Sequence, residues 1–159
     1  MNTSQKTTTV PDRRVILSTL WIFAMFNYLY ADVYTLFFNR LFAPETWKQL
    51  QAGQVAGTQL TQGFVLITAV LMETAIAMVL LSWVLSYRAN RWANIISGAF
   101  HTAFVAWSLS GEAPTLFYAF FSSVEIACTL FVVWYAWTWR SPEVSLNSMR
   151  LARGESGGN

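Results

Sequence analysis

Charged residues, cysteine and histidine are all scarce in this sequence. Lys, Arg, Asp and Glu together make up 11% of the 159 residues, against roughly 25% in soluble domains. The single cysteine, Cys128, excludes an intrachain disulfide and a cysteine-based zinc site. The single histidine, His101, excludes a haem held by two histidines of one chain. The net charge of +2, without a basic patch interleaved with aromatics, excludes nucleic acid as a partner.

Short motifs that mark common cofactors are also missing. The chain has neither the Walker glycine pattern nor the glycine fingerprint of dinucleotide-binding folds. Carboxylate and imidazole ligands would suit zinc, iron or manganese. However, neither Glu-x-x-His nor His-Glu-x-x-His occurs, so no metal is identified. The sequence therefore indicates no particular cofactor.

Hydrophobic residues, at 55% of the chain, are concentrated in long tracts that the charges avoid. Such tracts predict membrane-spanning helices, and we expect an all-α, polytopic four-helix membrane bundle. Its domain should cover residues 13–140, between a flexible N-terminal segment, 1–12, and a flexible C-terminal tail, 141–159. The four expected spans are about 15–38, 62–87, 92–110 and 115–139. Trp and Tyr residues near the span ends are expected to be interface anchors.

The connections between these spans differ in length. Residues 39–61 are polar or mixed, and Pro44 to Leu50 could form a short interfacial helix with Trp47 and Leu50 facing lipid, or an ordinary exposed loop. Residues 88–91 form a very short link, which predicts that the second and third spans are antiparallel neighbours. Residues 111–114 are expected to make a tight turn.

Basic residues are distributed unevenly between the two sides of the predicted bundle. One side would carry those of the N-terminal segment, the short link and the tail: Lys6, Arg13, Arg14, Arg88, Arg91, Arg140, Arg150 and Arg153. The other side would carry only Arg40 and Lys48. By the positive-inside rule, both termini are expected to be cytoplasmic. This predicts a multi-pass protein of the cell inner (cytoplasmic) membrane.

Each predicted span carries polar or ionisable residues, which are costly in lipid and by default mark a functional site. Asn27, Glu73, His101 and Glu125 fall near the midplane, and Asp32 lies further toward the outer side. In the third span, one stripe recurs at steps of three or four: Asn94, Ser97, Gly98, His101, Val105 and Ser108. The fourth span has a similar stripe: Tyr118, Phe121, Ser122, Glu125, Cys128 and Thr129. Because lipid offers these groups no hydrogen bonds, we expect the stripes to face inward.

The first two spans should contribute to the same interior. Ala69, Glu73 and Ala77 form a face of α-helical spacing on which a neighbouring helix could approach closely. In the first span, Tyr28 shares a face with Asp32, and Asn27 lies on another. The predicted binding site is therefore Glu73, His101, Glu125, Asp32 and Asn27, supported by Asn94, Ser97, Ser122, Tyr118 and Tyr28.

No basic residue lies within a predicted span to pair with these acids, except His101. We therefore expect some of Asp32, Glu73 and Glu125 to be protonated, to share a proton or to bind a cation. Structural roles are the alternatives. Asn27 could make an interhelical hydrogen bond, and Asp32 could cap a helix or reach the outer interface. Glu73, His101 and Glu125 could be ordinary hydrogen-bonded core residues.

Three classes of function fit this cluster. The first is binding of a proton, a cation or a small polar or lipidic ligand, of a transport type. The second is a non-catalytic accessory or structural subunit of a larger membrane complex. The third is a membrane enzyme acting on a lipid or quinone, with Glu and His as acid and base. Because this class ranks last of the three, a non-enzymatic role is favoured. Expected partners are membrane lipids and either further copies of the chain or a larger membrane complex.

Three stretches carry a resemblance to a known family. Residues 18–32, together with residues 71–82 and 87–94, resemble a family of small four-span bacterial membrane proteins of unknown function. The overall plan is also similar, more loosely, to the DoxX-like group. The resemblance implies a bacterial cytoplasmic membrane and a four-helix fold, and it implies no activity for any residue.

Overall fold

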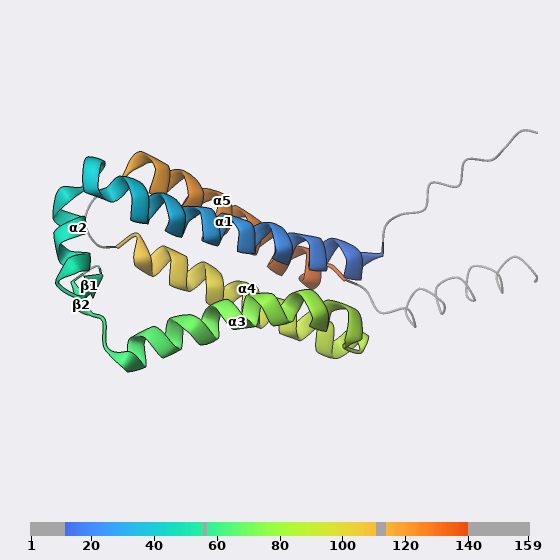
Figure 1. Cartoon of the computed structure of the whole chain (residues 1–159). Coiled ribbons are helices and arrows are strands. Elements are labelled where there is room, and N and C mark those ends of the chain that lie inside the picture. The colour runs from blue at the N-terminus through green and yellow to red at the C-terminus, as the bar shows by residue number, and fades with distance from the viewer. Residues whose placement is uncertain (1–11, 56, 111–113, 140–159) are drawn as a thin grey trace, which may run out of the picture.

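The computed structural model describes residues 12–55, 57–110 and 114–139, and this part of the chain is helical apart from one short strand pairing (Figure 1). The helices are α1 (Arg13–Phe42), α2 (Pro44–Gln51), α3 (Gln62–Val84), α4 (Tyr87–Ser108) and α5 (Leu116–Trp137). The pairing is antiparallel and joins β1 (Gln54–Val55) to β2 (Thr58–Gln59). The predicted flexible tail, and the N-terminal segment up to residue 11, lie outside the described residues.

Three of the helices, α1, α3 and α5, are long and apolar enough to cross a membrane. The length and composition of these helices therefore indicate an all-helical membrane protein with three candidate spans. The remaining predicted span corresponds to α4. This helix is long enough, but it is less apolar than the other three because it contains many polar residues.

The long helices pack around α1 and α5. The first helix lies against both α3 and α5, and α4 makes its most extensive contact with α5. A short link at Leu85 and Ser86 joins α3 to α4, but these two helices contact each other much less than α4 contacts α5. The predicted link at residues 88–91 is wrong in position, since α4 already begins at Tyr87.

Helices α4 and α5 approach each other closely at Gly98. A Cβ atom built on Gly98 would lie 2.8 Å from Cγ2 of Val133 and 3.2 Å from the carbonyl oxygen of Thr129. Only glycine fits this approach without displacing its neighbours. One turn further along α4, the hydroxyls of Thr102 and Thr129 are 2.7 Å apart, so the two helices are also hydrogen-bonded.

Hydrophobic side chains cover the outside of the helices, whereas polar side chains are frequent inside. Fully buried polar residues include Ser82, Asn90, Asn94, His101 and Thr129. Beyond the first turn of α4, which exposes Arg88, the large exposed side chains are apolar: Trp92, Ile96, Phe100 and Trp107. A soluble helix shows the reverse pattern, and in lipid the inward orientation satisfies polar groups that the solvent cannot.

The start of α1 and the end of α5 lie at the same end of the molecule (Figure 1). There, arginines at helix starts bind the last carbonyl oxygens of neighbouring helices. Arg13 donates to Tyr135 at 2.9 Å, Arg14 to Trp83 at 2.8 Å and Arg91 to Trp137 at 3.1 Å. These cations complement the negative ends of α3 and α5, and they satisfy carbonyl groups left without an intrahelical partner.

The connection between α1 and α3 contains the short helix that was one of two alternatives for this segment. Pro44 opens α2 in its first turn, where its missing N–H costs nothing. Trp47 and Leu50 are both half-buried rather than exposed. The strand pairing that follows was not predicted, and Gly57 provides a positive φ of 73° in its turn.

Candidate functional site

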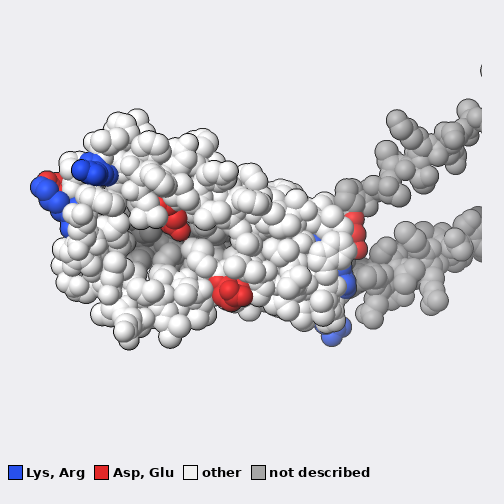
Figure 2. All heavy atoms as spheres, in the orientation of Figure 1, with Lys and Arg blue, Asp and Glu red and all other residues white. Residues whose placement is uncertain are grey.

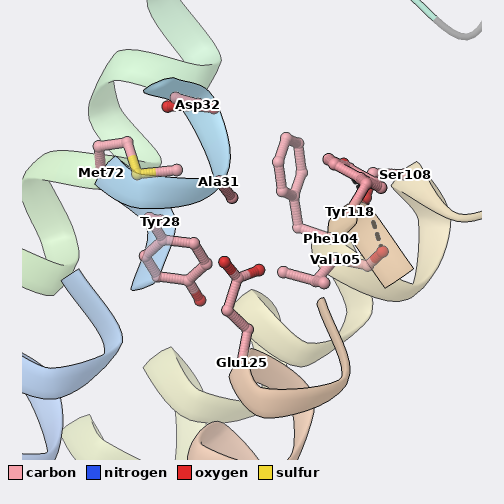
Figure 3. Close-up of a pocket in the computed structure, with 9 residues that line it drawn as sticks. All are labelled: Tyr28, Ala31, Asp32, Met72, Phe104, Val105, Ser108, Tyr118 and Glu125. Carbon is pink, nitrogen blue, oxygen red and sulfur yellow. Dashed lines mark hydrogen bonds between the residues drawn. The ribbon is translucent and has the colours of Figure 1, made fainter. Parts of the chain in front are cut away.

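A cavity of about 70 Å³ lies between the long helices, at the level where α1, α4 and α5 meet (Figure 3). It is lined by Tyr28, Ala31, Asp32, Met72, Phe104, Val105, Ser108, Tyr118 and Glu125. A water molecule requires at least about 10–15 Å³ of such space. The cavity is therefore large enough for a few waters or for one small ligand.

Glu125 closes the inner side of this cavity. Its side chain is 4% exposed, and its carboxylate points into the space beside Tyr28 and Val105 (Figure 3). Its Oε1 atom is buried and has no hydrogen-bond partner among the described residues. A buried polar atom without a partner is rare in folded proteins and calls for an explanation, such as a role in binding or catalysis.

Asp32 lies on the opposite side of the same space, on α1 (Figure 3). Unlike Glu125, it is exposed. Figure 2 shows acidic atoms midway along the molecule, beside a hollow in the surface and without Lys or Arg next to them. The cavity thus has an exposed acid at one end and a buried acid at the other.

The remaining polar groups of the cavity are already paired. The hydroxyl of Tyr118 donates to Ser108 at 3.0 Å, and Ser108 donates to the carbonyl oxygen of Val105 at 2.7 Å. The two carboxylates are therefore the groups left to bind a ligand.

His101 lies next to the cavity but does not line it. Its Nδ1 is 3.1 Å from the hydroxyl of Tyr28, and its Nε2 is 3.1 Å from the hydroxyl of Thr74. Thr74 donates its only proton to the carbonyl oxygen of Leu71, at 2.6 Å. The hydrogen-bond network thus assigns the ring proton to Nε2, and Nδ1 accepts from Tyr28. With both nitrogens hydrogen-bonded, His101 orients Tyr28 at the cavity wall and does not itself line the cavity.

A second polar network lies nearer the end of the bundle that holds the arginines. Trp21 Nε1 donates to Asn94 at 2.8 Å, and Asn94 donates to Asn90 Oδ1 at 2.6 Å. Asn90 in turn donates to the carbonyl oxygen of Ser82 at 2.6 Å. The network connects α1, α4 and α3, so Asn94 hydrogen-bonds between helices and does not line the cavity.

Sequence reasoning did not find Asn90 or Trp21. Asn90 was placed in the link between spans, although it precedes Asn94 by one helical turn and continues the same stripe. Trp21 carried no signal, because a tryptophan within an apolar tract is not distinguished from its neighbours. Of the predicted stripe on α4, the structure buries Asn94, Gly98, His101 and Val105, whereas Ser97 is half-buried. On α5 it buries Ser122, Glu125, Cys128 and Thr129.

The prediction that Glu73 converges on the interior is wrong. The structure buries the face of α3 that carries Leu71, Ala75, Met78 and Ser82. Glu73 lies on the opposite face and is exposed. Its neighbours along that face, Leu66 and Leu80, are 64% and 68% exposed. The small residues Ala69 and Ala77 were expected to mark the packing face, but Ala75 and Ser82 serve that purpose instead.

Asn27 was also expected to make a hydrogen bond between helices, but the observed bond lies within its own helix. Its amide donates to the carbonyl oxygen of Phe23 in its own helix, at 3.0 Å, and the side chain is half-buried. Asn27 does not line the cavity.

A metal centre built from Glu73, Glu125, Asp32 and His101 is not supported by the arrangement. Within residues 12–55, 57–110 and 114–139, no group of three or more His, Cys, Asp or Glu side chains is placed to hold a metal ion. Cys128 is buried, and its sulfur lies 3.5 Å from the carbonyl oxygen of Leu20.

These features define a helical membrane protein with an acidic internal cavity. Residues 8–146 match the model of a family of unknown function (DUF6326), and the chain belongs to this family. No curated protein and no solved structure matches the chain. The family has no assigned activity. The match also gives no source organism and no likeness to the DoxX-like group, so the bacterial source and the DoxX-like plan stay predictions.

Proposed function

We propose that this protein spans the cytoplasmic membrane four times and binds a proton, a cation or a small polar or lipidic ligand at Glu125, as a transport-type protein. The observation that carries the proposal is the buried Oε1 of Glu125, which has no hydrogen-bond partner in the described part of the chain and faces a cavity of about 70 Å³. An ionisable group held inside a membrane bundle without a partner is costly, and it persists where it has a function.

The direction of the side chains supports α4 as the fourth span. Its polar residues lower its average hydropathy, but they are the buried ones, whereas Ile96 and Phe100 on its outer face are 63% and 55% exposed. Lipid would therefore contact an apolar surface on α4. With four spans, the alternation of the helices brings both termini to one side.

The distribution of basic residues supports cytoplasmic termini. Arg13, Arg14, Arg88 and Arg91 belong to the end of the bundle where α1 begins, while Arg40 and Lys48 belong to the other end. The positive-inside rule favours the first end for the cytoplasm. The end of the cavity beside Asp32 would then lie about 15 Å along α1 from the outer end of that helix.

Chemical labelling of Glu125 tests the proposal. Diazomethane is apolar and small enough for a cavity of about 70 Å³, and it converts protonated carboxyl groups into methyl esters with release of N₂. In the protein reconstituted in lipid vesicles, we expect modification of Glu125, measured by mass spectrometry of the peptides, and its loss in Glu125→Gln. Glu45, which is exposed and paired with Lys48 at 2.9 Å, should not react. Absence of modification at Glu125, with reaction elsewhere, would contradict the proposed site.

Self-association through α3 is a second candidate function, favoured by the position of Glu73. This acid faces outward near the middle of a candidate span, and the one ion pair in the described part of the chain involves other residues. A protonated carboxyl group is both donor and acceptor, so two copies of Glu73 across a two-fold axis would satisfy each other. Ala69 and Ala77, one turn away on either side, would let the two helices approach closely. We therefore propose a second copy of this chain as the partner.

Replacing Glu73 should weaken this association. We expect Glu73→Leu to raise the dimer dissociation constant about tenfold, since an interhelical hydrogen bond in a membrane contributes roughly 1–2 kcal/mol. Glu73→Gln, which keeps a donor and an acceptor, should associate nearly as well as the natural chain. Sedimentation equilibrium in detergent measures both. Equal association of the Leu variant and the natural chain would exclude Glu73 from the interface.

A further inference from the structure

The lining of the Glu125 cavity specifies the charge of its ligand. Asp32 and Glu125 are acidic, and Lys and Arg are absent from the nine lining residues. The hydroxyls of Ser108 and Tyr118 are already hydrogen-bonded to neighbouring groups. A cation is therefore the complementary ligand, with the free Oε1 of Glu125 as its acceptor.

The rest of the lining argues against a bare metal ion. Hard cations such as Ca²⁺ and Mg²⁺ require about six or more oxygen ligands, from protein or retained water. The cavity offers two carboxylates and the already hydrogen-bonded hydroxyls of Ser108 and Tyr118, and its remaining walls are aromatic or apolar: Tyr28, Ala31, Met72, Phe104 and Val105. Aromatic rings and a thioether do not replace the hydration shell of a hard metal ion. They do accommodate an organic cation, whose charge interacts with ring faces and whose methyl groups pack on apolar walls.

The volume limits the size of that cation. An apolar cavity of about 150 Å³ holds one benzene molecule, whereas this cavity measures about 70 Å³. The space therefore fits a cation of a few heavy atoms, such as methylammonium, and excludes bulky aromatic cations.

We propose that the cavity binds a small primary or methylated ammonium ion, with its N–H groups on Glu125 and its alkyl part against Tyr28, Phe104 and Met72. This inference rests on the proposed function, because it assigns the ligand of the same site. Asp32, exposed at the other end of the cavity, supplies a second negative charge on the path of entry.

Binding of radiolabelled methylammonium to the purified full-length chain in detergent tests the assignment. We expect saturable binding at one site per chain that a large excess of NaCl does not displace. Glu125→Gln should weaken it at least tenfold, and Phe104→Leu about threefold to tenfold through loss of the aromatic wall. Glu73→Gln, which alters an acid outside the cavity, should bind as the natural chain does.

Two results would overturn the assignment. One is binding that is unsaturable or equally strong in Glu125→Gln and Phe104→Leu, and the other is displacement by sodium at equal concentration. If methylammonium does not bind although diazomethane modifies Glu125, the ammonium assignment fails and the proposed site stands. If neither is observed, both fail.

Discussion

Replacing Glu125 by methionine is expected to make the protein more stable. Methionine has a similar length and no carboxyl group, so it removes a buried acid whose Oε1 finds no partner among residues 12–55, 57–110 and 114–139. Leaving a buried polar group unsatisfied costs about 1–3 kcal/mol, and most of this should be recovered as a higher free energy of unfolding. The expected rise in Tm is about 2–6 °C, measured by circular dichroism in one detergent.

Two control variants give this result its meaning. Glu125→Gln keeps a polar group in the same place and should change Tm little. Ser123→Ala removes an exposed hydroxyl that bonds within its own helix, to Ala119 at 2.7 Å, and should also have little effect. If Glu125→Met instead lowers Tm by several degrees, Glu125 contributes to stability as an ordinary core acid, and the functional interpretation is wrong.

Asn94→Leu is expected to have the opposite and largest effect on stability. The substitution leaves the indole N–H of Trp21 and the Oδ1 of Asn90 without their partner, and all three residues are fully buried. Two buried groups left unsatisfied predict a loss of about 2–4 kcal/mol, even though a single interhelical hydrogen bond in a membrane contributes on average only about 0.6 kcal/mol. The expected fall in Tm is about 5–10 °C.

Asn27→Leu is the matched control for this substitution. It makes the same chemical change, but Asn27 is half-buried and bonds only to Phe23 of its own helix among the described residues. Its effect should be within about 0.5 kcal/mol. Equal effects of the two substitutions would mean that the Trp21–Asn94–Asn90 network does not stabilise the bundle.

The comparison of α3 and α4 shows how much of the site the sequence could predict. In α4 the polar residues recur on one face among apolar ones, so the inward face could be identified before the structure was known. In α3 apolar residues surround the whole helix, and Glu73 is its one charged side chain. No periodicity then distinguishes the packing face from the lipid face. The expectation that an acid turns inward therefore predicted the exposed face of α3 as its packing face.

The cavity itself depends on information that a single sequence does not contain. Glu125, Asp32, Tyr28 and Tyr118 were all predicted as site residues, and the structure places them around one space. His101 was expected to face the acids directly, but it contacts the cavity through Tyr28. The relative rotation and spacing of helices from distant parts of the chain decide such details, because they follow from close packing at positions such as Gly98.

The account depends most on the outer face of α4 contacting lipid. Only a bundle in which α4 also spans the membrane encloses Glu125 within the hydrocarbon region. A spin label at Phe100→Cys, in a Cys128→Ala background reconstituted in lipid vesicles, tests this directly through collisions with oxygen and with a polar nickel complex. We predict high accessibility to oxygen and low accessibility to nickel, as for a residue in the hydrocarbon core. High accessibility to nickel would place α4 in water and contradict the four-span bundle.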